Sequence, residues 1–204
     1  MPVEYFKAKK LLEEYGIKSI ESAYVSSASE AIAFSKGRPI AMKAIAEKAL
    51  HKSKAGLVFL NLSGKDQIEG AFRTLSRKAK GLGSYHIIVQ LMSQGGIEMI
   101  IGGKEDPQFG KMVLIGLGGI YVEVFRDFSM MSCPIASKDA AVMLSSLKSS
   151  RILAGQGNAA ELLEDLLLRI SRMLLANPEI KELDLNPVII RKDGYDIVDI
   201  RMMT

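Results

Sequence analysis

The sequence predicts an α+β fold that is divided into two small lobes. In the first half, segments with helical apolar spacing alternate with short apolar runs, and in the second half several strands precede two helices. The polar, glycine-rich stretch Ser93–Gly96 lies between two apolar runs and marks the expected boundary. A chain of 204 residues can hold two such lobes, and we expect them over residues 1–92 and 93–204.

The first half is expected to contain three helices and four strands. Its helices carry apolar residues every three or four positions and each is followed by a glycine; they span residues 4–15, 26–36 and 65–80. Its strands are short apolar runs at residues 23–25, 39–45, 57–61 and 85–92. Residues 47–56 are polar and are predicted to form a loop between two of these strands.

The second half begins with strands and ends with helices and a hairpin. We expect strands at residues 97–101, 112–116, 120–125 and 129–134, followed by helices at residues 137–147 and 158–176. The last segment predicts a hairpin with arms at residues 182–191 and 195–201. Asp193 and Gly194 separate these arms, and an Asp-Gly pair between alternating apolar residues is typical of a two-residue turn.

Composition excludes several classes of protein. The net charge is +4, but the basic residues are spread along helical faces, and only 6% of residues are aromatic, so we expect no nucleic-acid binding. The apolar runs are too short to span a membrane, and the first residues lack the apolar core of a signal peptide. The single cysteine, Cys133, cannot form an internal disulfide, which favours a cytoplasmic location.

The final hairpin brings polar side chains onto one face. A turn at Asp193 and Gly194 would pair Val188 with Asp199 and Asn186 with Arg201. Because side chains alternate between the faces of a strand, we expect one face to hold Asp184, Asn186, Val188, Ile197, Asp199 and Arg201. The opposite face would collect an apolar core of Leu183, Leu185, Ile189, Val198 and Ile200.

Asn186 and Asp199 are the candidate metal ligands in this hairpin. As diagonal neighbours their Cα atoms would lie about 7–8 Å apart, close enough for both side-chain oxygens to reach one cation. Mg²⁺ prefers oxygen ligands and takes only a few from protein. The structural alternative is that Asp199 and Arg201 pair with neighbours while Asn186 serves the turn before Pro187.

Two further features point to phosphate. Lys43 lies within the apolar strand Ile40–Ile45, where a phosphate would balance its charge, although a surface lysine on an edge strand is the common alternative. His51 lies in the polar loop at residues 47–56 and could act as base, ligand or phosphate carrier. His86 alternates with apolar residues and is expected to be structural. The run Gly116–Gly119 fits either a phosphate loop or a turn between strands.

Together these residues resemble the ATP-grasp β subunit, or β domain, of NDP-forming acyl-CoA synthetases. The resemblance extends along nearly the whole chain. Its most specific matches are Leu50-His-Lys-Ser53, Gly116-Leu-Gly-Gly-Ile-Tyr-Val-Glu123 with Phe125-Arg-Asp127 after it, and Glu182-Leu-Asp-Leu-Asn-Pro187.

The resemblance implies an ATP-grasp fold that holds ATP or ADP between two lobes. Lys43 would contact the phosphates, and the loop with Lys52, Ser53 and Gly56 would cover them. The residues implied at the adenine are Gln90, Leu91 and Met92, with Glu98 near the ribose or the metal. Asn186 and Asp199 would ligate Mg²⁺, in agreement with the hairpin geometry.

The implied reaction converts acyl-CoA, ADP and phosphate into acid, CoA and ATP. A separate CoA-binding α-type subunit would form the acyl phosphate and pass the phosphoryl group through histidine to ADP. His51 matches the histidine that carries phosphate in the β component. Since this chain carries no CoA-binding Rossmann pattern, we expect it to need that partner.

The chain departs from the family pattern at several cationic positions. Lys54 replaces an acidic residue in the loop, Met130 and Met131 stand where an arginine is usual, and Gln156 replaces an arginine between two glycines. Loss of cations weakens polyphosphate binding. A second hypothesis therefore stays open, in which the chain is a non-catalytic ATP-grasp module with a regulatory or structural role.

Overall fold

The computed structural model describes residues 1–46, 56–119 and 127–204. It divides into two compact units, which we describe separately: residues 20–94 form one unit, and residues 1–19 with 95–204 form the other. The predicted boundary at residue 92 lies close to this division, but the assignment of residues 1–19 to the first lobe is corrected. Those residues pack with the C-terminal unit, where Val3 donates a backbone hydrogen bond to Met202 (2.8 Å) and Pro2 forms an isolated β-bridge with Met203.

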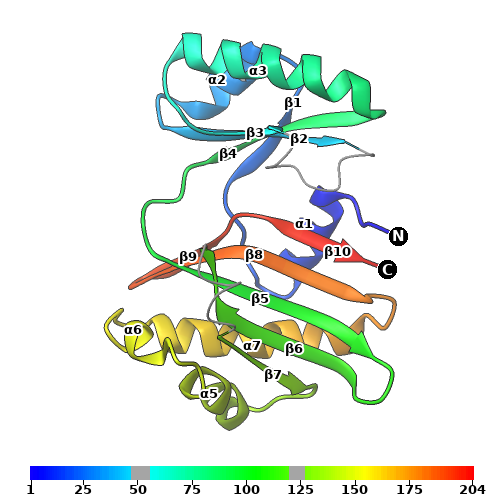
Figure 1. Ribbon diagram of the computed structural model, residues 1–204, viewed down its shortest axis with the longest axis vertical. Helices are drawn as coiled ribbons and strands as arrows, with labels where there is room; N and C mark the ends of the chain where they lie inside the picture. The colour runs from blue at the N-terminus through cyan, green and yellow to red at the C-terminus, as the bar shows by residue number, and fades with distance from the viewer. Residues whose placement is uncertain (47–55, 120–126) are drawn as a thin grey trace. The chain divides into compact units, whose positions relative to one another are not determined.

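The unit of residues 20–94 is a four-stranded antiparallel sheet with two helices on one face (Figure 1). Its strands follow the order β1-β4-β2-β3 across the sheet, with bounds β1 Ser22–Val25, β2 Ile40–Ala46, β3 Val58–Leu62 and β4 Tyr85–Leu91. The helices are α2 Ala28–Ser35 and α3 Lys65–Ala79, the latter continued by a 3₁₀ turn, Lys80–Leu82. This arrangement confirms the predicted helices and strands of the segment.

Apolar residues at alternate strand positions hold these helices against the sheet. Ile40, Met42 and Ala44 of β2 belong to one buried cluster with Ile68 and Leu75 of α3. Ser27 caps α2, because its Oγ accepts a hydrogen bond from the backbone N–H of Glu30 at 3.2 Å. The intervening β2 residues, Ala41 and Lys43, therefore face the other side of the sheet.

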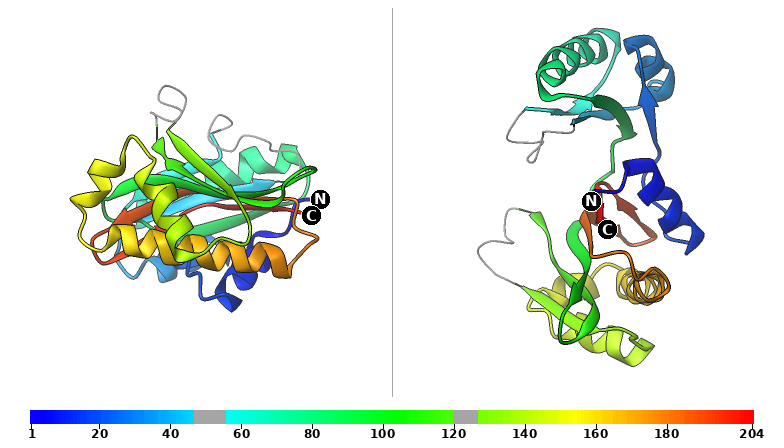
Figure 2. Two further views of the ribbon diagram at one scale, coloured as in Figure 1. Left: turned by 90° about the horizontal axis from the view of Figure 1, so that it is seen from below. Right: turned by 90° about the vertical axis from the view of Figure 1, so that its right-hand side faces the viewer.

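The second unit has a six-stranded antiparallel sheet covered on one face by helices (Figures 1 and 2). Five strands follow the order β10-β8-β5-β6-β7, and β9 also pairs with β8. The strand bounds are β5 Ile97–Asp106, β6 Gly110–Leu117, β7 Phe128–Ser132, β8 Glu182–Arg191, β9 Gly194–Ile197 and β10 Ile200–Met203. The helices are α1 Tyr5–Glu14, α5 Ser137–Ser145, α6 Ser150–Ala154 and α7 Ala159–Ala176.

Helix α7 forms the main core contact of this unit. Its buried face includes Leu166, Ile170 and Leu174, which pack on β5 and β6. Glycine at position 103 permits this close approach, because a Cβ there would lie 2.4 Å from Leu174 Cδ1. Residues at the intervening positions of β5, including Glu98 and Lys104, face away from α7, and we call this side of the sheet the outer face.

The structure also revises some sequence predictions for this unit. Strands β5 and β6 are longer than expected, and the short helix α6 was not predicted. The strand expected at residues 120–125 lies outside the described residues. Among the helices that the structure describes, none combines the length and apolar character required to cross a bilayer.

Candidate functional site

Lys43 and Gln90 lie together on one face of the four-stranded sheet. Lys43 pairs with Ile88 across the β2–β4 ladder, and Ala41 pairs with Gln90. Both polar side chains therefore project from neighbouring strands, on the face opposite α2 and α3. Lys43 is only 5% exposed and Gln90 only 2%. The alternative of a surface lysine on an edge strand is wrong, because β2 lies between β4 and β3 and its lysine is buried.

Other predicted nucleotide residues lie at the margins of the same unit. Leu91 is the last residue of β4, and the backbone N–H of Met92 donates to the carbonyl of Pro39 at 3.1 Å. Gly56 has a φ of 63°, and its carbonyl accepts a hydrogen bond from Lys78 Nζ at 3.2 Å. His51, Lys52 and Ser53 fall outside the described residues, so their predicted roles stay predictions.

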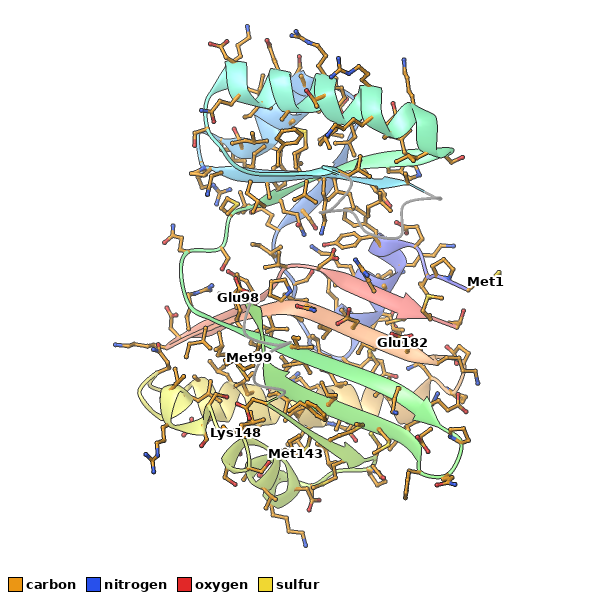
Figure 3. The ribbon with its side chains drawn as sticks, in the orientation of Figure 1. Met1, Glu98, Met99, Met143, Lys148 and Glu182 are labelled. Carbon is orange, nitrogen blue, oxygen red and sulfur yellow. The ribbon has the colours of Figure 1, made fainter. Side chains whose placement is uncertain are left out.

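Glu98 lies on the outer face of the six-stranded sheet. Figure 3 shows Glu98 and Met99 on β5, and their burial differs as expected for opposite faces: Met99 is fully buried and Glu98 is exposed. Glu98 pairs with Ile189 of the neighbouring strand β8. On the other side of β5, the backbone N–H of Gly118 donates to the Glu98 carbonyl at 2.6 Å.

Asn186 and Asp199 meet at an interruption of the final hairpin. The backbone N–H of Asn186 donates to the Asp199 carbonyl at 3.3 Å, and the N–H of Val198 donates to the Pro187 carbonyl at 3.0 Å. A β-bulge separates the β5–β8 pairs Met99–Val188 and Ile101–Leu185, so two β8 residues, Asn186 and Pro187, stand opposite one β5 residue. Proline lacks the N–H that a regular ladder requires, which favours such an interruption.

The predicted register of this hairpin is wrong by two residues. Arg191 pairs with Gly194, which places the turn at Lys192 and Asp193 rather than at Asp193 and Gly194. The shift places Asn186 directly against Asp199 instead of diagonally across from it. The two residues predicted to meet are therefore closer than the sequence indicated.

The predicted division of the hairpin into two faces also needs correction. Val188 and Ile197 were expected beside the polar residues, but both are fully buried. Ile189 and Val198, expected in the core, are only partly buried. The interruption at Asn186 and Pro187 reverses the alternation along β8, so that the core contains Leu183 and Leu185 before it and Val188 and Ile190 after it.

Acidic groups gather near Asp199 on the outer face. Asp199 Oδ2 lies 3.7 Å from Arg201 Nε, which agrees with the alternative in which these two side chains pair. Burial raises the pKa of the Asp184 carboxyl; Arg201 lowers it, whereas the charges of Asp199 and Glu182 raise it further. Three carboxylates therefore share one region with a single arginine acting on Asp184, and a bound cation would relieve their mutual repulsion.

The donor chemistry at this position fits Mg²⁺. Asn186 and Asp199 supply hard oxygen donors, and their backbones are joined by a hydrogen bond. Over residues 1–46, 56–119 and 127–204, no group of three or more His, Cys, Asp or Glu side chains is placed to hold a metal. A two-ligand site of this kind matches the preference of Mg²⁺ for keeping water and phosphate in its shell.

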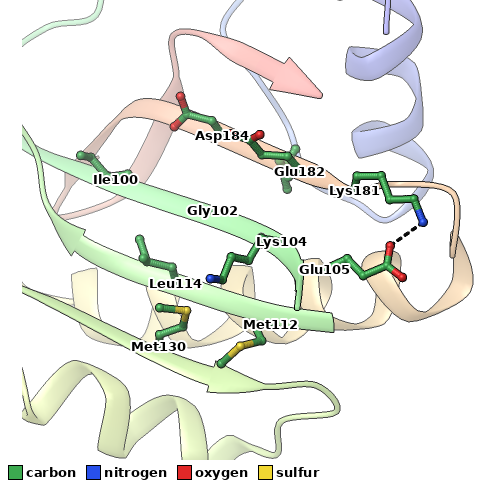
Figure 4. A pocket seen from close by; sticks show the side chains of 12 residues that line it. Ile100, Gly102, Lys104, Glu105, Met112, Leu114, Met130, Lys181, Glu182 and Asp184 are labelled. Atoms are coloured by element: carbon green, nitrogen blue, oxygen red, sulfur yellow. Dashed lines mark hydrogen bonds and ion pairs between the residues drawn. The ribbon is translucent and has the colours of Figure 1, made fainter. Parts of the chain in front are cut away.

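A groove of about 580 Å³ runs along the outer face beyond Asp184 (Figure 4). Its apolar part comes from β5, β6 and β7 and contains Ile100, Leu114, Met112 and Met130. Its rim is charged, and Lys181 Nζ lies 2.6 Å from Glu105 Oε2 there. The groove thus offers an apolar floor beside the acidic residues of β8.

Asp127 has a role that the sequence did not predict. Its carboxylate oxygens accept hydrogen bonds from the backbone N–H groups of Lys148 (2.7 Å) and Ser149 (2.8 Å). Burial alone would raise the pKa of Asp127, but the hydrogen bonds from Ser149 and Lys148 outweigh it and hold the pKa below its ordinary value. Asp127 therefore joins the start of β7 to the segment before α6.

The described candidates form two groups, each within one unit. Lys43 and Gln90 provide buried polar groups in residues 20–94, while Glu98, Asn186 and Asp199 provide oxygen donors in the other unit. A cation suits phosphate oxygens, and carboxylate and carboxamide oxygens suit a divalent metal. These are the two kinds of group that a magnesium–nucleotide complex requires.

Comparison with protein families finds that residues 3–204 match the model of the ATP-grasp domain. The chain is 36% identical over 207 residues to the β subunit of acetate–CoA ligase [ADP-forming] I from Pyrococcus furiosus, a match that covers 97% of this chain and 89% of that subunit. It is 40% identical over 205 residues to acetate–CoA ligase [ADP-forming] I from Archaeoglobus fulgidus. In that enzyme the match covers 95% of this chain but 30% of the longer protein.

Solved structures of an acetyl-coenzyme A synthetase 1 from Ca. Korarchaeum cryptofilum are also similar. One, in complex with coenzyme A and Ca-AMPCP, has a TM-score of 0.91 and 34% identity, covering 99% of this chain and 93% of that one. Another contains coenzyme A and Mg-AMPPCP, with a phosphohistidine segment pointing towards the nucleotide binding site. It has a TM-score of 0.84 and 32% identity, covering 99% of this chain and 92% of that one.

Proposed function

The chain belongs to the ATP-grasp domain family, and we propose that it is the nucleotide-handling part of an ADP-forming acyl-CoA synthetase. The overall reaction converts acyl-CoA, ADP and phosphate into acid, CoA and ATP. This chain transfers the phosphoryl group between a phosphohistidine and ADP. The observation that carries the proposal is the match over 97% of the chain to a separate β subunit of such an enzyme.

Lys43 is the residue proposed to bind the transferring phosphate. Its buried position supports this role, because a charge–charge contact is stronger where water is excluded. Catalysis of phosphoryl transfer depends mainly on positioning and on neutralising charge. Lys52, Ser53 and Gly56 complete the proposed phosphate contacts, with Gln90, Leu91 and Met92 at the adenine.

Asn186 and Asp199 are proposed to hold Mg²⁺, with Glu98 as a further oxygen donor near the ribose or the metal. Bound Mg²⁺ would supply positive charge that neutralises phosphate oxygens and orients them. The negative charges of Asp199 and Glu182 beside Asp184, which raise the pKa of its carboxyl, support a cation near these carboxylates. The chain's own contribution is to keep the two ligands adjacent through the Asn186–Asp199 backbone hydrogen bond.

His51 is proposed to carry the phosphoryl group within this chain. An oxygen of the terminal phosphate of ADP attacks the phosphorus, the nitrogen–phosphorus bond of phosphohistidine breaks, and the imidazole nitrogen takes up a proton. A neutral imidazole is a competent nucleophile near pH 7, so the same step runs in reverse with ATP.

The proposed partner is a CoA-binding α-type subunit or domain. The relatives are β subunits or longer single chains, and this chain spans only 30% of the longer ones. A partner would form the acyl phosphate and deliver its phosphoryl group to this chain. We place the complex in the cytoplasm, because Cys133 is a free cysteine and a reducing compartment suits it.

Labelling with ATP tests this function directly. The full chain is incubated with its α-type partner, Mg²⁺ and ATP labelled at the γ-phosphate, and acid-labile label on the chain is measured. We expect label on the wild type, loss of label in His51→Ala, and retention in His86→Ala, which removes the other histidine of the chain. Label retained in His51→Ala would refute the role of His51.

One observation favours a second candidate, a non-catalytic regulatory or structural module. Met130 is one of two methionines that stand where the family usually has an arginine. It lines the outer-face groove together with Met112 and Leu114. The groove there is apolar rather than cationic. A wild-type chain that binds Mg·ADP but accepts no label, with its partner present, would support this candidate over the enzyme.

A further inference from the structure

We propose that the Gly118–Gly119 turn positions the Glu98 carboxylate, and that Gly119 is therefore a positioning residue for nucleotide binding. The inference rests on the proposed function, in which Glu98 acts near the ribose or the metal. It adds two residues whose proposed role is to determine where an oxygen donor lies.

Gly118 brings its backbone unusually close to Glu98. Its N–H donates to the Glu98 carbonyl at 2.6 Å, which extends the β5–β6 ladder one residue beyond Leu117. A Cβ on Gly118 would lie 2.8 Å from the Glu98 carbonyl carbon and 2.9 Å from its oxygen. Because real Cβ atoms do not approach backbone so closely, only glycine permits this contact.

Gly119 then adopts a left-handed backbone conformation beside the Glu98 side chain. Its φ is +75°, in the left-handed region that favours glycine. A Cβ at this position would lie 3.0 Å from Glu98 Oε2 and 3.8 Å from Cδ. One carboxylate oxygen of Glu98 therefore lies close to Gly119, and a Cβ there would require that oxygen to shift by a few tenths of an ångström.

The position of this carboxylate involves no charged partner among the described residues. Within residues 1–46, 56–119 and 127–204, we find no hydrogen bond or ion pair from the Glu98 side chain. The backbone of Glu98 is nevertheless held on both sides, by Ile189 of β8 and by Gly118. A fixed backbone, a tight glycine contact and no ionic partner among the described residues leave the oxygens available to a ligand.

Gly110 provides a matched control for Gly119. It has nearly the same backbone, with a φ of +71°, and lies at the opposite end of β6. A Cβ on Gly110 would meet no atom within 4 Å. Substitution by alanine should therefore cause similar backbone strain at both positions, whereas only at Gly119 would the added Cβ approach Glu98.

A double-mutant cycle on the full chain tests the inference. Calorimetric titration with Mg·ADP is performed on the wild type, Gly119→Ala, Glu98→Ala, the double variant and Gly110→Ala. We expect Gly119→Ala to weaken binding about tenfold in the wild-type background and less than about twofold in the Glu98→Ala background. Gly110→Ala should bind as the wild type does.

Thermal unfolding and a second substitution keep the cycle interpretable. Gly119→Asn retains the Cβ but tolerates a positive φ better than alanine, so it replaces Gly119→Ala if that variant unfolds. Both substitutions should weaken Mg·ADP binding when Glu98 is present and have little effect in the Glu98→Ala background.

The outcomes separate this inference from the proposed function. Equal losses in both backgrounds, unchanged binding in Gly119→Ala, or unchanged binding in Glu98→Ala would each overturn the positioning role while leaving nucleotide binding established. Failure of the wild type to bind Mg·ADP would instead contradict the proposed function, and the inference would fall with it.

Discussion

The two units hold their candidate ligand-binding groups in opposite environments. In residues 20–94, Lys43 is 5% exposed and Gln90 is 2% exposed, and both lie on inner strands. In the other unit, the side chains of Asp199 and Arg201 are 21% and 49% exposed, and Asn186 is exposed. The Lys43 ammonium is thus largely removed from water before any ligand binds, whereas the proposed metal ligands keep contact with water.

This difference suits the two ligands. Removing water from a lysine strengthens its attraction for phosphate, because the local dielectric is lower. A magnesium ion keeps several water molecules, so its protein ligands need not be buried. Substitution of Lys43 or Gln90 should therefore weaken nucleotide binding strongly. Substitution of Asn186 or Asp199 should weaken binding less and should change stability little.

The largest effect is expected from Lys43→Met. Loss of one partner from a buried charge pair costs about 2–5 kcal/mol, which corresponds to roughly 30-fold to more than 1,000-fold weaker Mg·ADP binding. The chain should still fold, because methionine fills a similar apolar space. Calorimetry and thermal unfolding measure the two effects.

Lys65→Met is the matched control for Lys43→Met. Lys65 is 73% exposed on α3 and pairs with Glu69 at 3.8 Å, so its loss should leave nucleotide affinity unchanged. If Lys43→Met and Lys65→Met bind Mg·ADP equally well, the buried lysine is not a phosphate ligand.

A smaller effect is expected from Asp199→Ala. Removing one of two protein ligands should weaken Mg·ADP binding about tenfold and raise the Mg²⁺ concentration needed for half-saturation. Stability should change by about 1 kcal/mol, because Arg201 is half exposed and its 3.7 Å contact with Asp199 is long for an ion pair. The measurement is a nucleotide titration at several Mg²⁺ concentrations.

Asp193→Ala controls for the loss of a nearby carboxylate. Asp193 lies in the turn of the same hairpin, with its side chain 90% exposed. It should retain wild-type affinity at every Mg²⁺ concentration. A structural role for Asp199 would be indicated instead if its variant lost stability but kept its magnesium dependence.

Much of the fold follows from local patterns in the sequence. Helical spacing predicts α1, α2, α3, α5 and α7, with a terminal glycine after each of the first three, and apolar runs predict the strands that the structure describes. The five-residue helix α6 has too few turns to show a period. The placement of residues 1–19 depends on long-range pairing with β10, which no local pattern reveals.

The site was predicted in part for the same reason. Apolar neighbours left Lys43 either buried beside a phosphate or exposed on an edge strand, and the pairing of two strands predicted the proximity of Asn186 and Asp199. The hairpin register differs from the prediction by two residues, and side-chain alternation cannot distinguish the two registers because a shift by two preserves the faces. The structural role of Asp127 could not be predicted, because its hydrogen-bond donors are the backbone N–H groups of Lys148 and Ser149, more than twenty residues away in the sequence.

The central claim is that the intact chain binds a magnesium–nucleotide complex, and calorimetric titration of the wild type with ADP tests it most directly. We predict saturable binding below millimolar ADP in the presence of Mg²⁺, with much weaker binding when EDTA removes the metal. Absence of binding at millimolar ADP with Mg²⁺ present, from a chain that unfolds cooperatively on heating, would contradict the claim.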